Sequence, residues 1–397
     1  MNKKISLGAA ISLMAIVAAI TFVLANTFSL NIYNKTVSNV KEKAEIYKKL
    51  DEIDAFVREN YQGEINENTL INALANGYMA SLGDKYARYI VANEYSRLEL
   101  ERQGVSFGVG LELENAGGYA LVKSVYEGSS AKTEGILPGE YIIKINGVDL
   151  LAGGYDVVVP KLSGEVGSTV VVTVRNSESD RDLVLTRSKV TLTSVEGTMY
   201  NEMAYFKFLG FTDKTPTQFS NLLNTFIRNG AKAVILDVRN VSSNYVEPCV
   251  TILQTLLPQG EFAYSIVGEG EAVLLGESTG EGVKMPMAVL VNGASGGASE
   301  LLASALRDAD KAVLIGTKTQ GRGVKEEYFE CLDGSGICMT TGILRTHKSE
   351  TFNIVGLQPN YEVTLTDDSS EAIENLDETT DAQLKKAIEY LSTTLIK

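Results

Sequence analysis

At 397 residues the chain is too long for one ordinary hydrophobic core, which predicts two or three domains. Its 44% hydrophobic and 22% charged residues are typical of globular proteins and argue against a disordered chain. A net charge of -14 argues against a nucleic-acid partner, because phosphate binding needs basic patches. One histidine and three cysteines leave few metal ligands, so we expect neither a metal nor a cofactor. Any chemistry must therefore use Ser, Lys, Asp, Glu or backbone groups.

The N-terminus predicts a membrane anchor. Residues 5–34 contain no Asp, Glu, Lys, Arg or His, and residues 7–25 are almost entirely apolar, which is long enough to span a bilayer. Lys3 and Lys4 favour a single pass through the cytoplasmic membrane with the rest of the chain outside. A cleavable signal peptide is the alternative, because Val-Leu-Ala at 23–25 resembles a cleavage site. The length of the apolar run favours the uncleaved anchor, so residues 1–34 would be a cytoplasmic stub and a transmembrane helix.

The segment after the anchor predicts a helical arm over residues 35–100. Apolar residues recur at helical spacing over 41–61 and again over 68–81, where Gly83 follows as a plausible cap. The pattern leaves open whether this arm also pairs with another copy of the chain.

A β-rich domain is expected over residues 101–188, because the hydrophobic period changes to two near Ser106. Turns rich in glycine separate the strands. The expected strands cover residues 107–113, 119–125, 141–145, 170–174 and 182–185.

An α/β core is expected over residues 189–372, because strands there alternate with helices. An acidic connector and a last helix at about 381–392 would complete the chain as residues 373–397. The expected core strands are 204–208, 233–238, 288–291 and 312–315, and the expected helices are 216–229 and 298–308. The fold class is therefore a multidomain α/β protein with an N-terminal transmembrane helix.

Two cysteines flank an expected hairpin turn. Cys331 and Cys338 would form a disulfide across its strands in an oxidising compartment, or remain two reduced thiols, and the sequence leaves both open. Cys249 has no obvious partner.

The β-rich domain opens on a glycine-containing loop, Phe107, Gly108, Val109, Gly110 and Leu111. Glycines allow close approach of a ligand and let backbone N–H groups point at an anion. A strand that follows such a loop can accept an extended peptide at its edge. These five residues are the candidate peptide-binding site.

Three further segments make this domain resemble the PDZ domains of bacterial secreted proteases: residues 127–131, 135–140 and 142–147. In that family a helix forms the other wall of the groove, and it corresponds here to residues 155–162. Pro160 removes a backbone donor and restricts Val159, so we expect this helix to be short or kinked. A PDZ-shaped spacer that binds nothing is the alternative.

A strand-turn-helix corner near residue 297 is the candidate active site. The strand at 288–291 leads into Asn-Gly-Ala-Ser-Gly-Gly-Ala-Ser-Glu at 292–300, and then into a helix whose N-terminal N–H groups could stabilise an oxyanion. A second glycine-rich loop follows at 316–323. With the PDZ-like domain, these segments resemble the C-terminal processing peptidases, also called tail-specific proteases, which use a serine nucleophile, a lysine base and a glutamine that orients the lysine.

All three catalytic positions of that family are substituted. The resemblance aligns Gly297 with the serine, Arg322 with the lysine and Glu326 with the glutamine. Glycine has no nucleophile, and arginine stays protonated and cannot act as a base. We expect Glu326 to pair with Arg322. The family's Pro-Gly-Gly loop beside the oxyanion hole is also absent, because residues 242–244 are Ser-Ser-Asn.

A fallback nucleophile exists in Ser295, which lies in a Gly-x-Ser-x-Gly pattern. Its candidate bases are Lys318, Lys325 and His347, since a desolvated lysine or a histidine can activate serine. The plainer interpretation of Ser295 is a turn or capping serine.

The sequence favours a proteolytically inactive, membrane-tethered homologue of these peptidases. It would bind protein C-termini or extended peptides, form a homo-oligomer, or pair with an active relative. An active endopeptidase that trims C-termini through Ser295 and a purely structural role are the alternatives.

Overall fold

The structure of the protein is a computed structural model that describes residues 40–177, 179–348, 351–366 and 376–396, with the isolated Val17, Thr21 and Ile373. The predicted anchor over 7–25 lies outside the described residues except for Val17 and Thr21. Within the described part of the chain, no helix combines the length and the apolar character needed to cross a bilayer. The chain divides into two compact units, Met1–Leu70 and Ile71–Lys397.

The two predicted arm helices are confirmed. Helix α2 covers Val40–Asn60 and helix α3 covers Glu67–Ala80, so the division between the compact units falls within α3. Gly83 follows in the left-handed region (φ 68°), as expected of a residue that ends a helix.

The β-rich domain is an antiparallel sheet in the order β3-β4-β5-β7-β8, with β6 (Val148–Asp149) paired to β5. The five ordered strands are β3 (Leu111–Ala116), β4 (Tyr119–Val125), β5 (Tyr141–Ile145), β7 (Thr169–Arg175) and β8 (Asp180–Thr186). The predicted strand over 107–113 is instead two strands, because Gly110 turns the backbone with φ 85°. Its first part, β2 (Val105–Gly108), pairs separately with β9 (Ser188–Thr191).

Short helices complete this domain. They are α5 (Ser130–Thr133), α6 (Leu150–Gly153), α7 (Tyr155–Val158) and the 3-10 turn η1 (Val159–Leu162). The prediction that the wall of the groove is short and broken at Pro160 is confirmed, because α7 gives way to η1 there.

The core contains a six-stranded sheet in the order β10-β11-β12-β16-β18-β21. Within this sheet, the strands from β11 to β21 pair in parallel, whereas β10 is antiparallel to β11. These strands are β10 (Val195–Tyr200), β11 (Met203–Phe208), β12 (Ala233–Asp237), β16 (Met287–Val291), β18 (Ala312–Gly316) and β21 (Tyr361–Glu362). The predicted alternation of strands and helices is confirmed.

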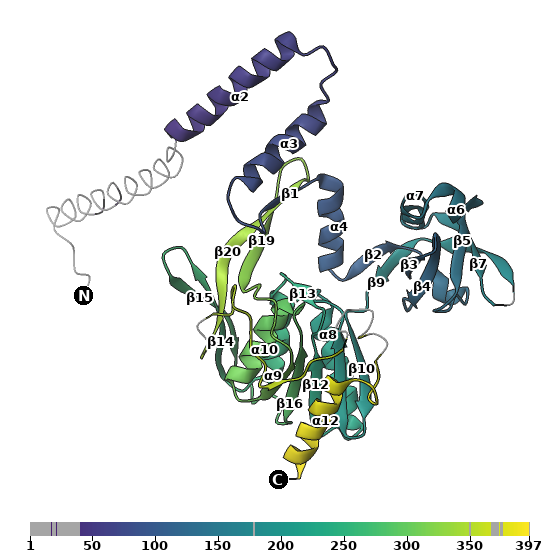
Figure 1. Ribbon diagram of the computed structural model, residues 1–397, viewed down its shortest axis with the longest axis vertical. Coiled ribbons are helices and arrows are strands. Elements are labelled where there is room, and N and C mark those ends of the chain that lie inside the picture. The colour runs from purple at the N-terminus through teal and green to yellow at the C-terminus, as the bar shows by residue number, and fades with distance from the viewer. Residues whose placement is uncertain are drawn as a thin grey trace, which may run out of the picture. The chain divides into compact units, whose positions relative to one another are not determined.

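Helices cover both faces of this sheet (Figure 1). Helices α8 (Thr215–Arg228), α9 (Glu247–Leu256) and α10 (Ala298–Asp308) share one apolar core with it. Helix α12 (Ala382–Leu395) packs against the alternate side chains of the same strands. Burial of both faces explains why β12 and β16 are continuous apolar runs rather than alternating ones.

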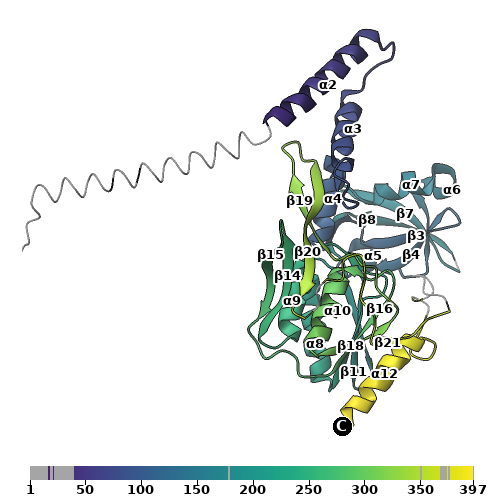
Figure 2. The same ribbon diagram turned by 60° about the vertical axis from the view of Figure 1, so that its left-hand side comes forward.

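A second, five-stranded sheet of the core was not predicted. Its order is β1-β20-β14-β15, with β19 paired to β20 (Figure 2). These strands are β1 (Arg88–Ile90), β14 (Gly260–Val267), β15 (Glu271–Ser278), β19 (Val324–Glu330) and β20 (Gly336–Thr346), and helix α4 (Ala92–Arg102) follows β1. The antiparallel hairpin of β19 and β20 carries Glu326 toward the candidate active site.

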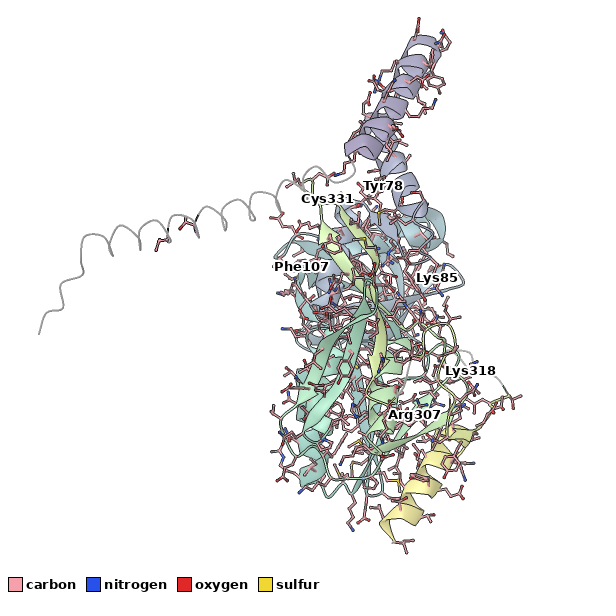
Figure 3. All side chains as sticks on the ribbon, turned by 90° about the vertical axis from the view of Figure 1, so that its left-hand side faces the viewer. Tyr78, Lys85, Phe107, Arg307, Lys318 and Cys331 are labelled. Atoms are coloured by element: carbon pink, nitrogen blue, oxygen red, sulfur yellow. The ribbon has the colours of Figure 1, made fainter. Side chains whose placement is uncertain are left out.

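The register of this hairpin keeps the two cysteines apart. Cys338 is paired with Tyr328, whereas the Cys331 N–H bonds to the Ser335 carbonyl at the turn (Figure 3). Three residue pairs separate these positions, which is about 10 Å along a strand and too far for a disulfide. All three cysteines are free, so the disulfide is not formed and the alternative of reduced thiols holds.

A buried ion network fixes the C-terminal helix to the end of β12. Arg239 bonds to Asp237 at 2.6 Å and to Asp381 at 2.7 Å, and it donates to Gln383 at 2.9 Å. Asp381 also caps α12 by accepting the N–H of Gln383 and of Leu384. Because Arg239 starts the loop that reaches the candidate site, this network fixes where that loop begins.

We expect Asp381→Ala to lower the free energy of unfolding by about 3–5 kcal/mol, because it leaves a buried guanidinium without one counter-charge. Urea unfolding followed by circular dichroism measures the change. Glu389→Ala on the exposed side of the same helix is the control and should change it by less than about 0.5 kcal/mol. Equal losses in the two variants would contradict the assigned role of Asp381.

Candidate active site

The corner between β16 and α10 is built around Gly297. This residue has φ 62° and ψ -112°, a conformation that side chains rarely tolerate. A sharp, strained strand-to-helix turn is where α/β hydrolases present a nucleophilic serine. At this corner a Cβ on residue 297 would lie 2.1 Å from the Ser243 carbonyl oxygen, well inside van der Waals contact. The strained turn is therefore present, but the loop opposite fills the space of a side chain.

The loop that contacts Gly297 is fastened along its length. Its strand β13 (Ser242–Ser243) pairs in parallel with β17 (Gly296–Gly297). The Ser242 hydroxyl donates to the Gln320 side-chain oxygen at 2.6 Å and accepts from Arg322 at 3.3 Å. The loop therefore closes the corner through both backbone and side-chain contacts.

Asn244 holds the far end of the same loop. Its Nδ2 donates to Glu326 Oε2 at 2.8 Å and to the Tyr328 hydroxyl at 2.5 Å. Tyr328 in turn accepts from Arg88 at 2.7 Å. Asn244 thus joins the loop to strand β19.

The N-terminus of α10 already has an internal acceptor. The Gly297 N–H donates to Glu300 Oε2 at 3.1 Å, and the same carboxyl group accepts from Thr319, Gly321 and Arg322 at 2.5–2.8 Å. Burial raises the pKa of Glu300, and these hydrogen bonds oppose that shift. The Gly297 N–H is therefore already bonded within the protein.

Arg322, which the predicted resemblance aligns with the family's lysine, forms an ion pair. Arg322 donates to Glu326 Oε1 from Nε at 2.9 Å and from Nη2 at 2.5 Å, which confirms the predicted pairing. The Glu326 side chain is fully buried, and Arg88 approaches its other oxygen at 3.8 Å. Burial raises the pKa of the neighbouring Cys338 thiol to about 11, so it stays neutral and donates to Glu326. Two arginines thus surround one buried carboxylate, and a guanidinium at position 322 cannot accept a proton from serine.

Ser295 lies behind the corner. It is fully buried, its Oγ accepts the Asn292 N–H at 3.0 Å, and it donates to the Val238 carbonyl at 2.8 Å. This is the geometry of a serine that closes a turn. Ser299 is also buried and donates to the Val241 carbonyl at 2.7 Å.

The fallback bases lie elsewhere. Lys318 is exposed on the loop after β18 (Figure 3), His347 is exposed after β20, and Lys325 pairs with Glu327. Within the part of the chain that the structure describes, the hydrogen-bond partners of the Ser295 side chain include neither a lysine nor a histidine.

The predicted peptide-binding loop retains unused donors. Val109 and Gly110 are buried, yet neither N–H has an acceptor among the residues that the structure describes. A cavity of about 60 Å³ adjoins them, lined by Phe107, Gly108, Leu111 and the end of η1 among others. Strand β3, which follows the loop, is the edge of its sheet. Buried N–H groups normally find acceptors, so this pair indicates a site for an anionic group.

Sequence reasoning missed the residues that fasten the loop over Gly297. Asn244, Tyr328, Arg88 and Gln320 come from four separate segments, and only the fold brings them together. The loss of the family's glycine at 244 was visible, but its contact with Glu326 spans 82 positions.

We expect Gly297→Ser alone to lower the free energy of unfolding by at least about 2 kcal/mol, through the left-handed backbone and the close Ser243 carbonyl. Thermal and urea unfolding measure the loss. Gly293→Ala is the matched control, because its Cβ would meet nothing nearer than 3.8 Å. A Gly297→Ser variant as stable as this control would show that the corner has room for a side chain.

Known proteins contain the same two domains, the β-rich domain and the α/β core. Residues 202–363 match peptidase family S41, and residues 121–176 match a PDZ domain. The chain is 23% identical over 338 residues to the probable CtpA-like serine protease of Staphylococcus haemolyticus, covering 84% of this chain and 68% of the relative. It is 28% identical over 290 residues to the carboxyl-terminal-processing protease of a Picosynechococcus species, covering 71% and 70%. A solved S41 protease candidate from Bacteroides fragilis shares the fold, with a TM-score of 0.51 at 17% identity, covering 80% and 90%.

Proposed function

We propose that this chain, a homologue of the C-terminal processing peptidases with an S41 peptidase domain and a PDZ domain, binds peptides without hydrolysing them. The two domain matches confirm the predicted resemblance. The observation that carries the proposal of inactivity is the Ser243 carbonyl, which lies 2.1 Å from the place of a side chain on residue 297.

Serine peptidase chemistry needs a nucleophile, a base and donors for the oxyanion. Gly297 offers no nucleophile, because glycine has no side chain. Arg322 stays protonated beside Glu326. A carbonyl oxygen at the corner would also repel a developing oxyanion, so each requirement fails for a separate physical reason.

The binding role rests on the PDZ domain. The unused N–H groups of Val109 and Gly110 suit a terminal carboxylate, and the edge of β3 can add an extended peptide as a further strand. The partners would be C-terminal or extended segments of other proteins.

The PDZ domain and the peptidase-like domain would lie on the outer face of the cytoplasmic membrane. Residues 7–25 would be the anchor, and Lys3 and Lys4 set the orientation. At that surface the protein would present bound chains to an active relative or withhold them from it. It would therefore regulate proteolysis rather than carry it out.

We expect the full-length protein to show no labelling by a fluorophosphonate probe, because no serine is activated. Gel fluorescence measures labelling, with an active C-terminal processing protease as the positive control. Labelling that disappears in Ser295→Ala would contradict inactivity and support the hydrolase alternative.

We expect Gly108→Val to weaken binding of a peptide with a free C-terminus by about tenfold or more, roughly 1.4 kcal/mol. Space for a Cβ exists at Gly108, where the Leu162 carbonyl is 3.4 Å away, so the larger side chain should block the cavity without unfolding the domain. Fluorescence anisotropy measures the affinity. Gly280→Val in the peptidase-like domain is the control, and the same peptide with an amidated C-terminus should bind weakly to every variant. Unchanged binding by Gly108→Val would place the binding site elsewhere.

A further inference from the structure

The edge strand of the PDZ domain has two unlike faces. Leu111 and Leu113 pack on the domain core together with Tyr155, as expected of alternate residues in a strand. The residues between them and beyond, Glu112 and Glu114, are exposed on the other face. A peptide added to this edge would therefore meet an apolar row on one face and an acidic row on the other.

The unused N–H groups set the register of such a peptide. If its carboxylate bonds to Val109 and Gly110, its last residue lies beside Leu111 and enters the cavity. Residues directly opposite each other in an antiparallel pair share a face. The penultimate residue of the peptide therefore lies beside Glu112, and the fourth residue from its end lies beside Glu114.

Among the residues that the structure describes, no lysine or arginine forms an ion pair with Glu112. Its carboxylate accepts the neutral hydroxyl of Ser124 at 2.7 Å. Glu112 also lines a cleft of about 460 Å³ that contains a second carboxylate, Glu101. Arg102, a cation of this cleft, donates to Glu99 at 3.0 Å and lies 4.2 Å over the Tyr245 ring, so its guanidinium makes contacts with groups other than Glu112.

The second carboxylate of the row is partly neutralised. Lys123 approaches Glu114 at 3.8 Å. Selection by charge should therefore be stronger at the penultimate position than at the fourth position from the end.

We propose that this groove selects chains that end in an apolar residue preceded by lysine or arginine. The inference rests on the proposed peptide-binding function and adds the class of chain that is bound. An opposite charge directly across a strand pair is favourable and a like charge is unfavourable, each by a fraction of a kcal/mol.

The test uses the full-length protein and short fluorescent peptides that differ only at the penultimate residue, lysine or glutamate, before a C-terminal leucine. We expect the lysine peptide to bind about fivefold more tightly, which corresponds to about 1 kcal/mol. A difference of this size is expected when the residue opposite Glu112 changes from glutamate to lysine. Glu112→Lys should reverse this preference. Asp182→Lys, on the opposite edge strand β8, should leave it unchanged.

The outcomes separate the two claims. Equal affinity for the lysine and glutamate peptides, or a preference that survives Glu112→Lys in a variant with an unchanged melting temperature, would overturn the inference and leave peptide binding intact. Failure of every free-carboxylate peptide to bind would overturn the proposed function and the inference with it.

Discussion

The contact between the Ser243 carbonyl and the backbone of Gly297 is the constraint on which the closed site depends. A positive φ persists where the surrounding structure requires it, and here Gly297 keeps φ 62° while the opposite loop fills the space of a side chain. Glycine is the residue that satisfies both the backbone and the contact. The glycine at position 297 and the closure of the loop are therefore two aspects of one packing arrangement.

Charged residues fix both ends of that loop. At its start, Arg239 is held between Asp237 and Asp381, and at its end Asn244 bonds to Glu326, which is itself neutralised by Arg322 and Arg88. A buried carboxylate with two cationic neighbours and an amide donor has its hydrogen-bonding capacity filled. Arg322 and Glu326 thus have a structural role, since they hold the loop that closes the corner.

The sequence predicted the order of helices and strands better than the side-chain contacts around Gly297. Continuous apolar runs predicted the buried strands β12 and β16, and the segment after β16 predicted helix α10, because each depends on local sequence alone. The second sheet was missed, because β1 and β20 come from segments far apart in the chain and their pairing leaves no local trace. The pairing of Arg322 with Glu326 was predictable from spacing along one segment. The contacts of Asn244 with Glu326 and of Gln320 with Ser242 were not predictable, because they join segments that are far apart in the sequence.

The most direct test of the closed site restores the family's residues in two steps. The first variant carries Gly297→Ser, Arg322→Lys and Glu326→Gln with its own loop, and the second adds the family loop. The loop changes are Val241→Asn, Ser242→Pro, Ser243→Gly and Asn244→Gly. Fluorophosphonate labelling of both variants is the measurement. We expect labelling only when the loop is also replaced, whereas labelling of the first variant would show that the Ser243 carbonyl does not close the site.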